Sequence, residues 1–293
     1  MREHHPKRGM RYLGIALGIT ISFFTIELVG GFLTNSLALL TDAWHMLNDA
    51  FSLALTLVAA WLAQRPITTK KTYGYYRAEI IAAFLNGVFL WAVVVFIFYE
   101  ALQRIQQPAE VESLNMIFIA VLGLIANGIS VLILSRSRDE NLNIKGAFLH
   151  VVADTLGSLG AISAGLIMFF TGWYQADALI SMIIGALIFY SSWGLIRESL
   201  NVLLEGVPSQ IEVTSVERKI VELEGVKSVH DLHIWSITPT KMRTMSAHIM
   251  VERGIDRKKL IAMLINILKE EFEIEHTTFQ LEEAGYPKAV GEH

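Results

Sequence analysis

The sequence predicts an all-α domain of six membrane-spanning helices followed by a small α+β domain. Two observations carry this prediction. First, 53% of the 293 residues are hydrophobic, which is high for a soluble domain of this length. Second, residues 12–203 hold nearly all of the excess, and charged residues return at normal density from Glu205 onward. We therefore divide the chain into an N-terminal segment (1–11), a helical domain (12–203), an α+β domain (204–285) and a tail (286–293).

Six stretches reach the length of about 20 apolar residues that a helix needs to cross the hydrocarbon core of a bilayer. Polar or turn-forming segments separate them, such as "TNS" at 34–36 and "TGWYQAD" at 171–177. The expected spans are 12–33, 36–62, 80–101, 114–135, 146–170 and 177–200.

Lys and Arg side chains predict the orientation of these spans, because they are enriched on the cytoplasmic side of membranes. They gather before the first span and in the connections 64–77 and 135–145, whereas the three connections on the opposite side contain Arg104 alone. Both termini are therefore expected in the cytoplasm, with the spans in the inner (plasma) membrane. No small-residue cleavage site follows the first span, so we expect this span to be retained.

The C-terminal residues combine two kinds of hydrophobic spacing. Residues 209–226 and 256–272 have helical spacing, whereas 228–238, 244–252 and 275–283 alternate as strands do. The order helix, strand, strand, helix, strand predicts a small open sheet with both helices on one face.

Two spans carry the same pair of polar residues. His45 and Asp49 lie four residues apart in the second span, and His150 and Asp154 repeat this spacing in the fifth. Residues four apart share one helix face, and each charged group inside a membrane costs about 2.5–3.5 kcal/mol on insertion scales. We therefore expect the pairs to face each other. Two imidazoles and two carboxylates suit a tetrahedral divalent ion, Zn²⁺ first, and neutralise its charge.

Other interpretations of these polar residues are open. An intramembrane His or Asp can simply hydrogen-bond a neighbouring helix. For Glu27 and Asp42 we favour helix packing, a water-filled cavity or a gate over metal ligation. Two inward His side chains also suit a haem-binding electron carrier, although an Asp one turn away would charge the haem pocket. Carboxylates line the pores of passive channels as well, so a divalent-metal channel is a further alternative.

Composition excludes several chemistries. The chain has no cysteine, which excludes disulfides and thiolate metal sites. Its net charge of −4 does not point to a nucleic acid partner, and it contains no His-Glu-x-x-His motif of a metalloprotease. We expect neither an enzyme activity nor an organic cofactor.

Four segments carry a resemblance to a known family: "SLALLTDAWHMLNDAFSLALTLVAAW", "TYGYYRAEIIAAFLNG", "GAFLHVVADTLGSLGAISAG" and "SLNVLLEGVP". They resemble the cation diffusion facilitator family, and its bacterial cobalt–zinc–cadmium efflux branch in particular. The resemblance runs from the first span to the last strand. It implies a homodimer that exports Zn²⁺, with Cd²⁺ or Co²⁺, in exchange for protons, and a ferredoxin-like (metallochaperone-like) cytoplasmic domain.

The same resemblance implies that the transport site consists of His45, Asp49, His150 and Asp154, and His at position 45 is similar to the zinc-preferring members. Two accessory metal-binding features of some family members are not expected here. The connection 64–77 has neither His nor Asp, and the connection 135–143 has no His. The N-terminal pair His4 and His5 has no predicted role.

A regulatory metal site in the cytoplasmic domain is also implied by the resemblance, at His230, His248, His276 and Glu282. Strand alternation places His276 and Glu282 on one face of the last strand. On the first strand it favours His233 over His230, and these two remain alternatives. The competing interpretation is a surface with histidines and no metal.

Arg77 begins the third span and Glu205 follows the sixth, both at the cytoplasmic boundary. The family has an ion pair between protomers at matching positions. We therefore expect Arg77 and Glu205 to hold the membrane halves of a dimer together. The alternative is that Arg77 only anchors lipid headgroups.

Overall fold

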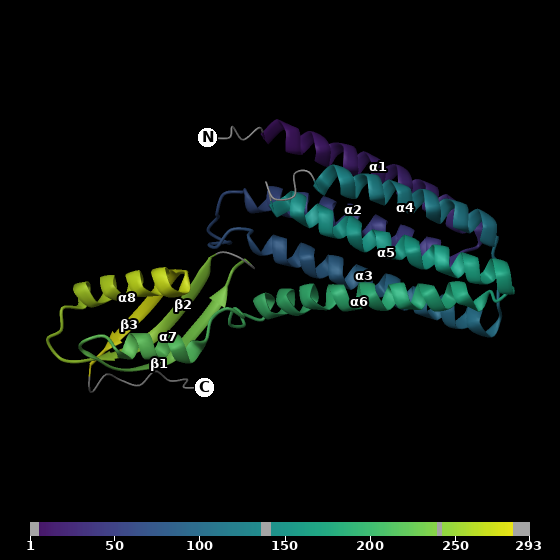
Figure 1. Cartoon of the computed structure of the whole chain (residues 1–293). Coiled ribbons are helices and arrows are strands. Elements are labelled where there is room, and N and C mark those ends of the chain that lie inside the picture. The colour runs from purple at the N-terminus through teal and green to yellow at the C-terminus, as the bar shows by residue number, and fades with distance from the viewer. Residues whose placement is uncertain (1–5, 136–141, 239–241, 284–293) are drawn as a thin grey trace. The chain divides into compact units, whose positions relative to one another are not determined.

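The structure is a computed structural model that describes residues 6–135, 142–238 and 242–283, except for the side chains of 6–17, 19–20, 53, 133–135 and 142–153. Six long helices precede a small α+β domain (Figure 1). The helices are α1 (Pro6–Thr34), α2 (Leu37–Ala63), α3 (Arg77–Gln106), α4 (Ser113–Ser135), α5 (Leu142–Thr171) and α6 (Gln175–Leu203).

The six predicted helices are therefore confirmed, and several extend beyond their predicted ends. The 30 residues of α3 form a helix about 45 Å long, which exceeds the roughly 30 Å hydrocarbon core. The length of an apolar run corresponds to the thickness of that core. The helix turns that carry charged residues such as Arg77 and Arg104 therefore extend beyond the core into the interface. Among the described residues, five helices are long and apolar enough to cross a membrane, and α1 adds the apolar stretch Ile21–Thr34.

The chain divides into two compact units, Met1–Ala54 with Asn86–Trp193 and Leu55–Leu85 with Gly194–His293. In the first unit, α4 packs against both α1 and α5 (Figure 1).

Small side chains allow this close packing. Ala120 of α4 and Ala161 and Ala164 of α5 are fully buried in one cluster, together with Met116 and Met168. Helices in lipid associate through such small residues because burying apolar surface yields little there.

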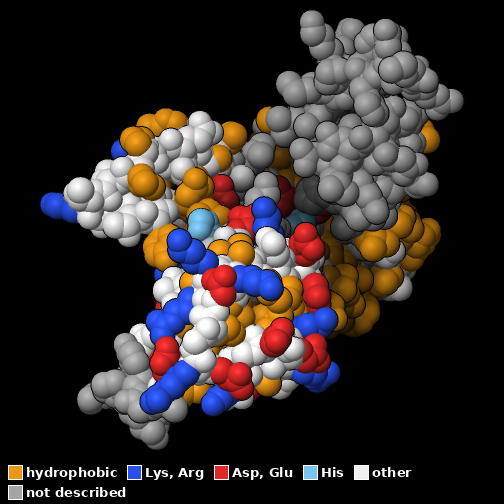
Figure 2. Space-filling model, turned by 90° about the vertical axis from the view of Figure 1, so that its left-hand side faces the viewer, with side chains coloured by type: hydrophobic (Ala, Val, Ile, Leu, Met, Phe, Trp, Pro, Cys, Tyr) orange, Lys and Arg blue, Asp and Glu red, His pale blue; other side chains and the backbone are white. Residues whose placement is uncertain are grey.

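The long helices carry many exposed apolar side chains. Large apolar side chains on the helices are exposed, including Val95 (67%), Phe170 (77%) and Tyr190 (82%). Figure 2 shows broad areas of hydrophobic side chains and, elsewhere, Lys, Arg, Asp and Glu side chains closely interspersed. Helices of this length with exposed apolar side chains suit contact with the hydrocarbon core of a bilayer.

The C-terminal domain has the predicted element order. It consists of α7 (Val213–Val221), β1 (Val226–Ser236), β2 (Arg243–Val251), α8 (Arg257–Phe272) and β3 (Ile274–Glu282). The sheet order is β1-β2-β3, with β1 antiparallel and β3 parallel to β2.

One apolar core holds this domain together. Val216 and Ile220 of α7 and Leu264 of α8 pack with Met245 and Ile249 of β2. Since α7 and α8 also contact each other, both helices cover the same face of the sheet, as predicted.

Candidate metal sites

Helix spacing brings three of the four predicted transport-site residues together. His45 Nε2 lies 3.9 Å from Asp49 Oδ2, one turn along α2, and 3.9 Å from Asp154 Oδ1 on α5. Asp154 is buried, with 6% of its side chain exposed, whereas His45 and Asp49 are partly open. His150 lies one turn before Asp154 on α5, and its side chain is outside the described residues.

These distances suit a metal site better than direct hydrogen bonds. Both distances of 3.9 Å exceed the range of an N–H···O hydrogen bond, which ends at about 3.2 Å. Two ligand atoms on one tetrahedral zinc lie roughly 3.3 Å apart, since zinc bonds to nitrogen and oxygen are about 2.0–2.1 Å long. A metal ion would therefore draw His45 and the two carboxylates together by about half an ångström.

Two further carboxylates, Glu27 of α1 and Asp42 of α2, are buried close to this site. Their residues are 2% and 4% exposed. Asp42 lies close enough to Glu27, Asp154 and Asp49 for electrostatic interaction. Glu27 Oε2 has no hydrogen-bond partner among the described residues. Four acidic side chains thus share one region inside the helical domain.

Glycines make room for these two carboxylates. A Cβ atom on Gly123 of α4 would lie 2.7 Å from Glu27 Oε1, and one on Gly157 of α5 would lie 3.1 Å from Asp42 Oδ1. Both acids are visible in the sequence, inside the first and second apolar spans, but their proximity to the His–Asp pairs is not. The glycines opposite them become meaningful only in three dimensions.

A second cluster forms on the sheet of the C-terminal domain. His230 Nε2 lies 3.2 Å from Glu282 Oε2, and His248 Nδ1 lies 3.0 Å from Glu282 Oε1. One ligand atom of each residue lies within 4.8 Å of the others. Two imidazoles and a carboxylate at this spacing are able to bind a divalent metal.

A β-bulge brings His230, rather than His233, beside His248 and Glu282. His230 pairs with His248, and His233 pairs with Ser246, so β1 contains one residue more than β2 over this interval. The extra residue re-aims the strand, and Asp231 takes a left-handed conformation there (φ 51°). Simple alternation fails at a bulge, and His230 therefore shares the face of His248. His233 Nε2 instead lies 3.0 Å from Asp231 Oδ1.

His276 lies apart from this cluster. It is exposed and is opposite Thr244 in the β2–β3 register, whereas Glu282 is opposite Met250. Six residues along a strand correspond to about 20 Å. The C-terminal domain thus brings three of its four predicted ligands together.

Arg77 and Glu205 form an ion pair within one chain, with Arg77 Nη2 2.9 Å from Glu205 Oε1. Both residues belong to the second compact unit. Glu205 lies two residues beyond the end of α6 and has a left-handed backbone (φ 58°). The predicted pairing is present inside the protomer, and a role between protomers stays a prediction.

Comparison with known proteins identifies the family. Residues 13–204 match the cation efflux transmembrane domain, and residues 208–284 match the cytoplasmic domain of cation efflux proteins. The first match alone covers more than half of the chain, so the chain belongs to the cation efflux (cation diffusion facilitator) family.

Individual relatives are similar over nearly the full length. The chain is 44% identical over 279 residues to the cation efflux system protein CzcD of Alcaligenes sp., covering 95% of this chain and 88% of that protein. It is 41% identical over 288 residues to a cadmium, cobalt and zinc/H(+)-K(+) antiporter of Bacillus velezensis, covering 97% and 92%. These relatives are transporters, not enzymes. A solved metal-bound C-terminal domain of the CzcD transporter from Cupriavidus metallidurans is 33% identical, with a TM-score of 0.23, and covers 25% of this chain and 99% of that one.

Proposed function

We propose that this protein exports divalent metal ions, Zn²⁺ first, through a tetrahedral site formed by His45, Asp49, His150 and Asp154. The observation that carries the proposal is the position of His45 Nε2, 3.9 Å from carboxylates on two different helices. Two carboxylates cancel the charge of a divalent ion, so the loaded site is neutral inside the membrane. The relatives named for cobalt, zinc and cadmium support the same class of substrate.

Proton exchange is the driving force that we infer. Zinc binds His and carboxylate ligands only in their deprotonated forms, so protons and metal compete for the same side chains. Antiport follows if the protein changes access mainly when one or the other is bound. The relative named as an H(+)-coupled antiporter supports this mechanism.

The assembly we propose is a homodimer in the inner membrane with both termini in the cytoplasm. The distribution of Lys and Arg over the connections supports this orientation. Cytoplasmic metal would then load an inward-facing site, and protons from a more acidic exterior would displace it.

Zinc flux into sealed proteoliposomes under an imposed pH gradient tests the proposal, with Asp49→Ala as the inactive control. We expect the wild-type flux to reverse when the gradient reverses and the Asp49→Ala flux to vanish. Zinc flux that ignores the pH gradient would favour a passive channel. A Soret absorption band in the purified protein would favour the haem-binding carrier.

We also propose that His230, His248 and Glu282 bind a regulatory metal ion. The support is their convergence within 4.8 Å. Equilibrium dialysis of the full chain with Asp49→Ala, which removes the transport site, tests this second site. We expect one zinc per chain to remain and to be lost on adding His248→Ala. Equal zinc content with and without His248→Ala would contradict it.

A further inference from the structure

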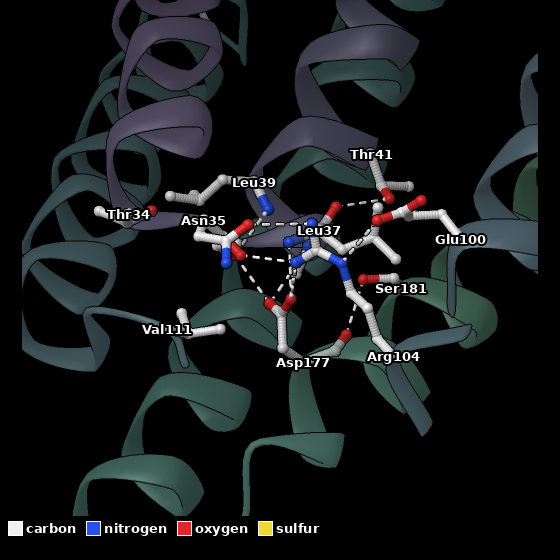
Figure 3. Close-up of polar contacts among 12 residues, drawn as sticks. Thr34, Asn35, Leu37, Leu39, Thr41, Glu100, Arg104, Val111, Asp177 and Ser181 are labelled. Carbon is white, nitrogen blue, oxygen red and sulfur yellow. Dashed lines mark hydrogen bonds and ion pairs between the residues drawn. The ribbon is translucent and has the colours of Figure 1, made fainter. Parts of the chain in front are cut away.

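Asp177, in the first turn of α6, is buried at the end of the helical domain where α2 begins. Only 1% of the residue is exposed. Its Oδ1 accepts hydrogen bonds from Ser36 Oγ at 2.7 Å and from the amide of Ala38 at 3.2 Å, and its Oδ2 accepts from the amide of Leu37 at 2.6 Å. Figure 3 shows the carboxylate aimed at the first turn of α2.

These bonds complete the N-terminal cap of α2. Ser36 precedes the helix, and its Oγ also accepts from the amide of Leu39 at 3.2 Å. The first amides of a helix have no partner inside the helix, and the positive end of the helix dipole favours a carboxylate. The cap of α2 is thus supplied largely by a residue that lies about 140 positions later in the chain.

Arg104 extends the cluster to α3. Its Nη1 donates to the Asn35 carbonyl oxygen at 2.6 Å, and its Nη2 donates to Asn35 Oδ1 at 3.1 Å. Nη1 also lies 3.8 Å from Asp177 Oδ2, and Nε lies 3.0 Å from Glu100 Oε1 (Figure 3). The α1–α2 turn, α3 and α6 are therefore joined at one polar cluster around the buried Asp177.

The same cluster constrains the distance between the two helices that carry the His–Asp pairs. His45 lies about 12 Å along α2 from Leu37. The segment 172–174 alone separates α5, with Asp154, from α6, with Asp177. Asp177 thus ties the beginning of α2 to the α5–α6 hairpin, and the bond lengths of a metal site vary by only about 0.2 Å.

We propose that Asp177 is a positioning residue for metal transport, which sets the placement of α2 against α5 and thereby the metal affinity of His45, Asp49 and Asp154. This inference rests on the proposed transport function. Asp177 does not touch the metal and acts through the backbone of α2. Arg104 neutralises the buried carboxylate and holds the preceding turn.

Asp177→Asn in the full-length protein tests the inference. The amide keeps one acceptor oxygen but turns an N–H₂ group toward the Leu37 amide and Arg104. We expect the calorimetric Kd for zinc, measured with His248→Ala to remove the second cluster, and the KM of zinc flux in proteoliposomes to rise together by about tenfold, because zinc binding must then restore the placement of α2 that the intact cap provides. Ser36→Ala keeps the carboxylate and is expected to raise both constants less. Ser36→Ala also tests the inference if Asp177→Asn does not fold.

Glu112→Gln is the matched control, since this exposed carboxylate near the start of α4 bonds only locally, to Asn115. A purely structural role for Asp177 would lower the unfolding temperature and leave Kd and KM of the folded protein unchanged, and that result would overturn the inference. An equal rise in Glu112→Gln would overturn it too. Wild type and Asp49→Ala are measured alongside: if wild-type zinc flux survives Asp49→Ala, the proposed transport site itself has failed.

Discussion

His45 is the residue that links the two halves of the proposed transport site, because its Nε2 lies 3.9 Å from carboxylates on both α2 and α5. Glu27 and Asp42 lie close to this set without belonging to the predicted ligands. At the scale of single residues, the proposal therefore depends on whether each predicted ligand is needed.

Replacing His45 or Asp154 with Ala is expected to reduce zinc flux by more than about 100-fold, because each supplies one of four ligands and even groups behind the ligands contribute 10–100-fold. Flux in proteoliposomes measures the effect, and the elution profile of the purified variant establishes that it is folded. Glu252→Ala, an exposed acid of the C-terminal domain, is the control. Near-normal flux in either ligand variant would remove the four-ligand site.

His45→Asp should change selectivity rather than abolish transport. The substitution exchanges a nitrogen ligand for a harder oxygen and adds one negative charge. We expect manganese or cadmium to gain about tenfold relative to zinc, measured as flux under direct competition. An unchanged preference would mean that selectivity is determined outside the first ligands.

At the scale of elements, the bulge in β1 decides which histidine reaches Glu282. The left-handed backbone of Asp231 costs about 1–2 kcal/mol for most residues, while Asn and Asp adopt it more readily. The carboxylate also lies 3.6 Å from His248 Nε2.

Asp231→Val is expected to destabilise the C-terminal domain by about 1–2 kcal/mol and to weaken its zinc binding, because a β-branched residue disfavours the bulge. Asp231→Asn keeps the backbone preference and is expected to bind zinc more tightly than Asp231→Val. Zinc titration of the two full-length variants, each carrying Asp49→Ala, compares them. Equal affinities would show that the bulge does not orient His230.

At the scale of the whole molecule, coupling to protons decides whether the protein is an antiporter or a passive channel. Each proton displaced by zinc lowers the metal affinity about tenfold per unit fall in pH once the ligands are protonated. Zinc ligands bind the metal in their deprotonated forms, so zinc and protons exclude each other at the proposed site.

Zinc affinity of the solubilised protein is therefore expected to be highest at about pH 7.5 and to fall steeply toward about pH 5.5. Calorimetry in buffers of different ionisation enthalpy measures the protons released. His248→Ala removes the second cluster, so that the signal reports the transport site. Buffer-independent heats together with flat affinity would contradict the exchange mechanism.

The Arg77–Glu205 pair is tested by a double-mutant cycle. If the pair stabilises the dimer, Arg77→Gln and Glu205→Gln each weaken dimer association, and the double variant is no weaker than either. An exposed pair inside one protomer contributes only about 0.2–1 kcal/mol. Arg65→Gln, in the same basic connection, is the control: an equal effect there would favour lipid anchoring over pairing.

The sequence alone determined the six helices, the order of the C-terminal elements and the two His–Asp pairs. These features depend on local physics, namely apolar length, hydrophobic period and the i, i+4 geometry of one helix. The apolar runs even located most helix ends within a few residues.

Tertiary structure decided the remaining features, because these features depend on contacts between residues that are distant in the chain. Alternation could not anticipate the bulge that selects His230, since a bulge arises from pairing between strands. Nothing in the local sequence of α2 predicts that Asp177 completes its cap. Only the packing of α1, α2, α4 and α5 brings Glu27 and Asp42 close to the predicted site, because that proximity depends on contacts between different helices.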